Sequence, residues 1–106
     1  MEYISGLQSL QNCLNSEQYI LLFFTASWCG PCKKIYPQLE ELYKNLNKDL
    51  IKIYKLDVDT EDNSEILKIF KITSMPSFCL VKDKQCINTL KGGDINGIKK
   101  MLNIKD

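Results

Sequence analysis

The sequence lacks two residue types that carry much of protein chemistry. It contains no histidine, which excludes histidine metal ligands, cysteine–histidine catalysis and imidazole pH switches. It also contains no arginine, so all 14 basic side chains are lysines and no bidentate guanidinium contact is available. The net charge is only +1, and there is no excess of positive charge to neutralise nucleic-acid phosphates. Functions that need imidazole, guanidinium or a strongly basic surface are therefore excluded.

Long apolar runs and a dense set of cysteines are missing as well. The longest apolar stretch, Tyr19 to Phe24, is far too short to span a bilayer. Residues 1–6 contain no basic region followed by an apolar one, so we expect no signal peptide. The five cysteines are an odd number and too few for a disulfide-stapled scaffold. We therefore expect a cytoplasmic monomer with mostly reduced thiols and no nucleic-acid or membrane partner.

The length of 106 residues predicts one domain that spans residues 1–106. Apolar residues recur at helical spacing in some segments and form short runs typical of buried strands in others. Helices are expected at 6–16, from Cys32 to about 46, at 61–71 and at 95–102, and strands at 3–4, 19–24, 51–58, 77–81 and 86–90. This alternation, which ends in a hairpin, predicts an α/β fold: a mixed sheet of four or five strands with helices on both faces.

Three local signals refine this expectation. Ser5 to Gln8 has the spacing of a capping box, which predicts that the first helix starts beside Ser5. Pro37 lies inside the second helix, where its ring and its missing N–H predict a kink. Lys82 to Gln85 separates the last two strands and predicts the loop of a β-hairpin.

The most informative segment is Cys29-Gly30-Pro31-Cys32, between an expected strand and an expected helix. Two cysteines separated by two residues can close a small disulfide ring at such a turn. The unpaired N–H groups and the dipole of a helix N-terminus favour a thiolate at Cys29. Cys32 lies one turn further in and is expected to be more buried, which suits a resolving thiol. Pro31 stiffens the turn, and a Gly-Pro pair is associated with a reducing potential.

Other roles for the cysteines remain open at this point. Cys29 and Cys32 could form half of a structural zinc site, but the remaining ligands would be Cys79 and Cys86, which are not a close pair. We expect no metal. Cys79 lies in an apolar strand and is interpreted as a core residue, although it could face Cys86 across the hairpin as a second redox pair. Cys13 adjoins the apolar face of the first helix and is interpreted as a spare thiol.

The segment from Trp28 to Lys33, Trp-Cys-Gly-Pro-Cys-Lys, resembles the active site of the thioredoxin family, and this match is highly specific. The resemblance implies the thioredoxin fold and a protein-disulfide reductase, with Cys29 as nucleophile and Cys32 as resolving thiol. It implies disulfide-containing protein substrates, a reductase that recharges the pair, and no tightly bound cofactor. Trp28 is then expected to be a partly exposed lid over the active site.

Further positions extend the resemblance along almost the whole chain. Pro37 lies where family members kink the active-site helix. Met75-Pro76 resembles the cis-proline loop that faces the redox disulfide and pairs with substrate backbone. Gly92, in Lys91-Gly92-Gly93, resembles the segment that opens the last helix and completes the substrate groove. The groove residues implied in this way are Trp28, Gly30, Pro31, Met75, Pro76 and Gly92.

One position departs from the family pattern. The family usually carries a buried Asp six residues before the nucleophile, thought to help deprotonate the resolving cysteine, and here that residue is Phe23. Proton transfer to or from Cys32 then needs another route, for which Lys55, Asp57 and Asp59 are candidates. We expect slower resolution or an altered pH profile. An aromatic residue at this site is also similar to the tryparedoxin and nucleoredoxin branch, whose members usually have Pro-Pro between the cysteines.

Two interpretations compete with the reductase. A disulfide oxidase or isomerase would need an oxidising compartment and a destabilised disulfide, and Gly30-Pro31 and the expected lack of a signal peptide argue against it. Alternatively, the fold is an interaction module in which the cysteine pair is dispensable. Phe23 gives that second interpretation some weight.

Overall fold

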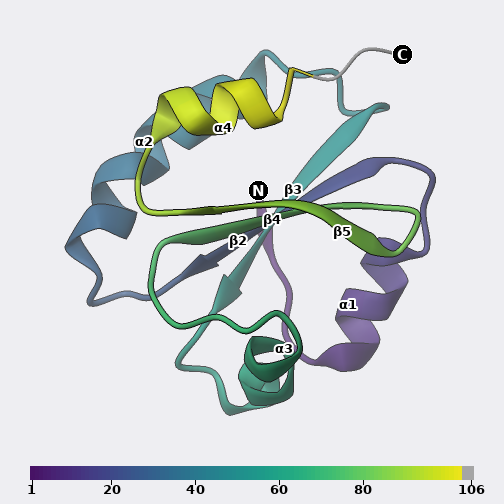
Figure 1. The fold of residues 1–106 in the computed structure, drawn as a ribbon, viewed down its shortest axis with the longest axis vertical. Coiled ribbons are helices and arrows are strands. Elements are labelled where there is room, and N and C mark those ends of the chain that lie inside the picture. Colours follow the sequence, from purple (N-terminus) through teal and green to yellow (C-terminus); the bar gives the residue numbers. More distant parts are fainter. Residues whose placement is uncertain (104–106) are drawn as a thin grey trace.

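The computed structural model describes residues 1–103, which form a five-stranded mixed sheet with helices on both faces (Figure 1). The strands are β1 (Glu2–Tyr3), β2 (Tyr19–Thr25), β3 (Ile51–Asp57), β4 (Ser77–Lys82) and β5 (Gln85–Lys91). The helices are α1 (Leu7–Leu14), α2 (Gly30–Lys44), α3 (Ser64–Ile69) and α4 (Ile95–Met101), with a 3-10 turn η1 (Glu61–Asn63). The expected alternation and the final hairpin are confirmed. No helix within residues 1–103 is long and apolar enough to cross a membrane.

The sheet is organised around β2, which is central in the strand order β1-β3-β2-β4-β5. β2 runs parallel to β3 and antiparallel to β4, while β1 and β5 form the two edges. Every residue of β2 after Tyr19 is buried, because helices cover both faces of the sheet. The continuous apolar run in the sequence therefore marks the middle strand.

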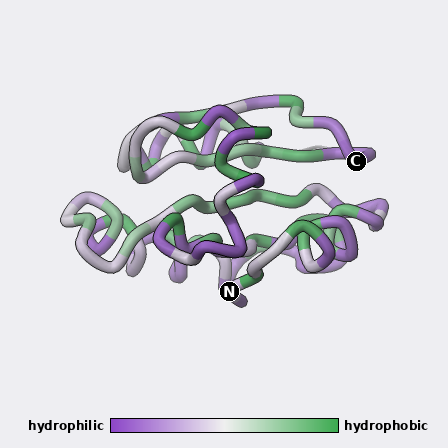
Figure 2. Tube along the Cα trace, turned by 90° about the horizontal axis from the view of Figure 1, so that it is seen from below, coloured by the Kyte–Doolittle hydropathy of each residue, from purple (hydrophilic) through white to green (hydrophobic). Residues whose placement is uncertain are grey.

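Two apolar clusters fill the space between the sheet and its two helical layers. On one face, Leu21 and Phe23 of β2 pack with Ile35 and Leu39 of α2 and with Ile98 of α4. The other face brings together residues of β2, α1 and α3, namely Ile20, Leu22, Phe24, Leu10 and Ile66. Because successive side chains of a strand point to opposite faces, β2 supplies both cores. Figure 1 shows the two helical layers, and in Figure 2 extended segments carry hydrophobic stretches whereas the helices mix hydrophobic and hydrophilic residues.

The first helix is shorter than predicted and lacks the capping box. α1 begins at Leu7, and its N-cap is Gly6, whose φ is +88° and which has no side chain to cap the helix. The Gly6 N–H instead donates to Oδ1 of Asn63 at 2.9 Å. The predicted capping box at Ser5 is therefore wrong, because a contact distant in the sequence replaces the local cap.

One other helical prediction needs adjustment. The segment 61–71 is not one helix, since the 3-10 turn η1 precedes α3 and α3 ends at Ile69. In α2, Pro37 has no N–H to donate to the carbonyl oxygen of Lys33. The helix continues through Pro37 to Lys44, with its apolar side packed against the sheet, and the kink at Pro37 stays a prediction.

The hairpin between β4 and β5 has a tighter turn than predicted. Its loop contains only Asp83 and Lys84, whose φ values of +52° and +65° suit a two-residue hairpin turn. The pairing also shifts by one residue between Leu80 and Val81, which marks a β-bulge. The residues of β5 are nearly all exposed, whereas those of β4 are nearly all buried. The hairpin therefore has a buried inner strand, β4, and an exposed edge strand, β5.

Phe23 lies where three strands meet beneath α2. Its ring is fully buried and stacks on Phe78 of β4, with centroids 4.9 Å apart and planes 8° from parallel. Its neighbour on the other side, in β3, is Lys55. Phe23 and Phe78 belong to the same apolar cluster as Cys29 and Cys32. An aromatic pair therefore fills the space under the cysteines.

Replacing Phe23 by Ala should lower the free energy of unfolding by about 3–5 kcal/mol, because a large cavity opens in the core. Urea denaturation followed by fluorescence measures this loss. Ile87→Ala is the control, since Ile87 is 52% exposed on β5, and its change should stay below about 0.5 kcal/mol. Similar small losses in both variants would contradict this account of the core.

Candidate active site

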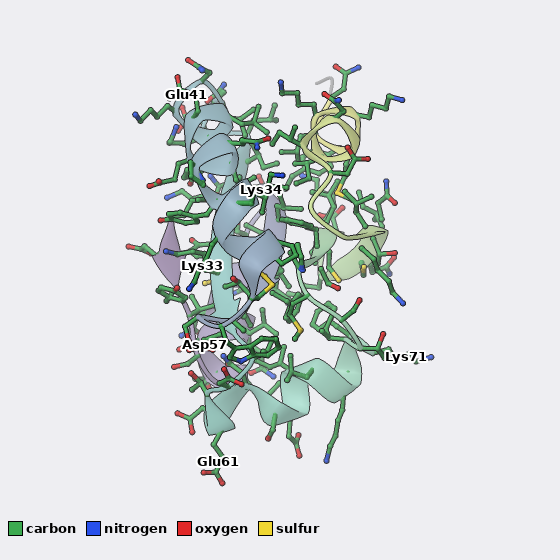
Figure 3. The ribbon with its side chains drawn as sticks, turned by 90° about the vertical axis from the view of Figure 1, so that its left-hand side faces the viewer. Lys33, Lys34, Glu41, Asp57, Glu61 and Lys71 are labelled. Carbon is green, nitrogen blue, oxygen red and sulfur yellow. A yellow bond between two sulfur atoms is a disulfide. The ribbon has the colours of Figure 1, made fainter. Side chains whose placement is uncertain are left out.

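The cysteine pair lies where β2 leads into α2. β2 ends at Thr25, and α2 begins at Gly30 with Cys29 as its N-cap residue. Cys29 and Cys32 form a disulfide, with their Cα atoms 5.2 Å apart; Figure 3 shows this bond at the start of α2. The N–H of Cys32 donates to Sγ of Cys29 at 3.2 Å. The Cys29 sulfur thus lies where a helix N-terminus stabilises negative charge.

Both cysteines are almost fully buried, with 4% of Cys29 and 2% of Cys32 exposed. The predicted difference in burial between them is therefore small. Their neighbours provide access instead, because Gly30 and Pro31 are exposed and Trp28 is 63% exposed. A substrate disulfide must reach the sulfur of Cys29 across this exposed rim.

A chain of hydrogen bonds holds Trp28 beside the pair. Its indole Nε1–H donates to Oδ2 of Asp59 at 2.6 Å. The N–H of Asp59 in turn donates to Oδ1 of Asp57 at 2.9 Å. The sequence named both carboxylates as candidates for proton transfer but missed the contact with Trp28. That contact joins residues 31 positions apart, so no local pattern indicates it.

The loop before β4 meets the segment after β5 next to the start of α2. The Met75–Pro76 peptide bond is cis, as the resemblance implied. The Gly92 N–H donates to the carbonyl oxygen of Pro76 at 2.8 Å, and Gly92 has a φ of +92°, which favours glycine. A Cβ atom on Gly93 would lie 3.5 Å from the carbonyl oxygen of Pro31. Two of the segments implied to form a groove are thus bonded to each other, and the glycine segment lies next to the active-site turn.

Lys55 is a buried cation in β3. It is 8% exposed, and its Nζ lies 4.0 Å from the ring centroid of Tyr3 and 4.7 Å from that of Tyr36. The ammonium also donates to the Tyr36 hydroxyl at 3.2 Å. The sequence named Lys55 but missed both tyrosines, because Tyr3 belongs to a two-residue edge strand and Tyr36 is hidden in a helical pattern.

The other three cysteines are not disulfide-bonded. Burial raises the pKa of the Cys79 thiol to about 12, helped by the neighbouring Cys86, so Cys79 is unreactive at neutral pH. The strand register places Cys79 opposite Thr89 and Cys86 opposite Val81, so the two cysteines are diagonal neighbours on one face of the hairpin, close enough for the Cys86 side chain to affect the Cys79 thiol. Burial also raises the pKa of the half-buried Cys13 thiol.

The zinc alternative would need further ligands close to the active-site pair. Within residues 1–103, no group of three or more cysteine, aspartate or glutamate side chains lies close enough to hold a metal ion. Cys79 is buried in β4 and Cys86 is exposed on β5. The cysteine pair instead bonds to itself, which fits a redox disulfide.

Comparisons with known proteins agree with this site. The thioredoxin family model matches residues 6–104. A thioredoxin of Coprinus comatus is 34% identical over 102 residues, which cover 96% of this chain and 94% of the relative. A thioredoxin of Mycobacterium tuberculosis is 42% identical over 79 residues, 74% of this chain and 66% of the relative.

Solved structures give the same result. The crystal structure of Malassezia sympodialis thioredoxin superposes with a TM-score of 0.87 at 31% sequence identity, over 95% of this chain and 86% of that one. The X-ray structure of Fasciola hepatica thioredoxin superposes with a TM-score of 0.87 at 28% identity, over 96% of both chains. The match to the family model along nearly the whole sequence, together with the redox pair, shows that this chain belongs to the thioredoxin family.

Proposed function

We propose that this chain reduces disulfide bonds in other proteins, with Cys29 as the attacking thiol and Cys32 as the resolving thiol. Membership of the thioredoxin family and the redox pair make it a protein-disulfide oxidoreductase. The observation that carries the proposal is the Cys29–Cys32 disulfide at the N-terminus of α2. The Cys32 N–H that reaches the Cys29 sulfur gives the attacking thiolate a hydrogen-bond donor.

The reaction transfers two electrons in two exchange steps. The Cys29 thiolate attacks a substrate disulfide, a mixed disulfide forms, and one substrate sulfur leaves as a thiolate that takes up a proton. The Cys32 thiol then loses its proton and attacks the Cys29 sulfur, which releases the second substrate sulfur. The substrate gains two electrons and two protons, and the Cys29–Cys32 pair becomes a disulfide. A reductase must return two electrons and two protons before the next cycle.

The partners and setting follow from this cycle. The substrates are disulfide-containing proteins, whose backbone would pair with the loop at Met75 and Pro76 beside Gly92. The electron donor is a thioredoxin reductase or an equivalent enzyme. We further propose that the chain acts as a monomer in the cytoplasm, where most protein thiols are kept reduced.

The reduction potential of the Cys29–Cys32 pair separates a reductase from an oxidase. We expect a value near about −270 mV, which is the range of reducing thioredoxins. Trp28 is the only tryptophan and lies beside the pair, so its fluorescence in glutathione buffers reports the redox state. A value above about −200 mV would contradict the reductase and favour an oxidase, an isomerase or glutathione-linked work.

Removing Cys32 should trap the first step of the reaction. In Cys32→Ser, the mixed disulfide between Cys29 and a protein substrate cannot be resolved, so it should accumulate and appear in intact mass spectra. Cys29→Ser should form no adduct and lose activity by about a thousandfold or more. Cys86→Ser is the control, because Cys86 is exposed on β5, and its activity should stay within about twofold. Full biological activity without both active-site cysteines would instead support the interaction module.

The role of Asp57 and Lys55 in proton transfer at Cys32 remains a prediction. If the Asp57 carboxylate accepts the Cys32 proton, Asp57→Asn should slow resolution several-fold near neutral pH. The difference should vanish at high pH, where Cys32 ionises without help. Stopped-flow fluorescence of Trp28 follows the step. The control is Asp62→Asn, whose carboxyl is exposed in η1. Parallel pH profiles for all three proteins would contradict a role for Asp57.

A further inference from the structure

A second pair of cysteines lies on the β4–β5 hairpin. Cys79 is buried in the middle of β4, and Cys86 is exposed near the start of β5. Neither of them is disulfide-bonded. Cys79 packs in the apolar cluster beneath α1 and α3, whereas Cys29 and Cys32 belong to the cluster on the other face of the sheet. The sheet therefore separates this second pair from the redox disulfide.

The β-bulge in this hairpin turns both thiols to one face of the sheet. Cys86 and Thr89 are three positions apart, so in a regular strand their side chains would point to opposite faces. Here Thr89 pairs with Cys79. Cys86 pairs with Val81, which lies in the same apolar cluster as Cys79. The extra residue is Ile87, which the register leaves without a partner on β4. The bulge therefore makes Cys86 a diagonal neighbour of Cys79.

The two thiols also lie close together. The Cys86 thiol donates to the carbonyl oxygen of Asn88 at 3.6 Å, so its side chain leans along β5 toward Thr89, the residue opposite Cys79. A side-chain hydrogen bond with Cys86 and the charge of Cys86 both help to raise the pKa of Cys79. Cys79 also borders a cavity of about 230 Å³ that Thr89 and Phe70 line as well. Its side chain therefore has room to turn toward Cys86.

We propose that Cys79 and Cys86 form a second redox pair, which a low-molecular-weight disulfide such as oxidised glutathione converts to a disulfide across the hairpin. The exposed Cys86 reacts first: its thiolate attacks one glutathione sulfur, and the other glutathione leaves as a thiolate that takes up a proton. The Cys79 thiol then loses its proton and attacks the Cys86 sulfur, which releases the second glutathione. The pair loses two electrons and two protons, and the glutathione disulfide gains them.

The second step proceeds although Cys79 is buried. Once Cys86 holds glutathione it no longer carries a thiolate charge, and that charge is one cause of the raised Cys79 pKa. Attack within one molecule also needs no encounter between reactants, so a small thiolate fraction is enough. Cys79 is therefore a poor nucleophile toward external reagents and an adequate one toward its neighbour.

The bulge also gives the two sulfurs the freedom to join. The Cα atoms of diagonal neighbours are typically about 7–8 Å apart, and those of a disulfide are typically about 5.5–6 Å apart. The strands must therefore approach by roughly 1–2 Å. β5 is an edge strand with nearly all of its residues exposed, and its ladder is already interrupted at the bulge. It can therefore move locally without disturbing the core.

The test uses a variant in which only this pair can react. Cys13→Ser/Cys29→Ser/Cys32→Ser keeps Cys79 and Cys86 as its only cysteines, so the result does not depend on the proposed reductase activity. The protein is incubated with oxidised glutathione at about pH 8.5, because exchange needs thiolates. It is then denatured, alkylated and measured by intact mass spectrometry. We expect both thiols to disappear, with the mass of two hydrogen atoms lost and no glutathione attached.

A relocated thiol is the matched control. In the same background, Cys86→Ser/Asn88→Cys moves the exposed thiol to a residue that pairs with Leu80 and points to the opposite face from Cys79. This protein should keep a glutathione adduct, and its Cys79 should stay free. A glutathione adduct that persists at Cys86 in the first variant, or equal disulfide formation in both proteins, would overturn the proposal.

The wild-type protein provides a second measurement if the triple variant does not fold. Lys82 and Lys84 lie between Cys79 and Cys86, so trypsin places the two cysteines on different peptides. After oxidation by glutathione disulfide and alkylation, these two peptides should be recovered joined to each other. Recovery of separate peptides, each alkylated or carrying glutathione, would contradict the second redox pair.

Discussion

The pairing of β2 with both β3 and β4 is the constraint on which the active site depends. In register, Thr25 aligns with Asp57, and Phe24 aligns with Ser77, the residue after Pro76. The last residues of β2 and β3 and the first residues of β4 therefore lie at the same end of the sheet. A slip of one residue would turn Phe23 to the wrong face, and it would move the cysteine turn away from the cis-proline loop.

The interior beneath the cysteines shows how one substitution changes a local environment. Phe23 places an aromatic ring where the family usually has a carboxylate, and the stack with Phe78 uses the space for packing. Lys55 is then left with aromatic faces in place of an anion. Cation–π contacts of this kind offset part of the cost of burying an ammonium group. The aromatic stack thus fills this part of the core, and Lys55 lies beside it among tyrosine rings.

The sequence predicted features correctly where residues close together in the chain determine the structure. The position of Cys29 at a helix N-terminus follows from neighbouring residues, and the cis bond at Pro76 followed from the family resemblance. Contacts between distant residues were not predictable: the Asn63 side chain meets Gly6 across 57 positions, and Asp59 meets Trp28 across 31. The offset of Cys79 and Cys86 depends on strand register and a bulge, which no periodicity reports.

The two edges of the sheet bear on how copies of this chain behave when crowded. β1 contributes only two residues, so it offers little backbone for another strand to join. β5 is longer and exposed, but the bulge beside it interrupts its regular ladder, and Lys91 ends it with a charge. Short, irregular and charged edges disfavour strand-to-strand association between molecules. The edges of the sheet that aligns the redox pair are therefore poorly suited to pairing with a strand of a second copy.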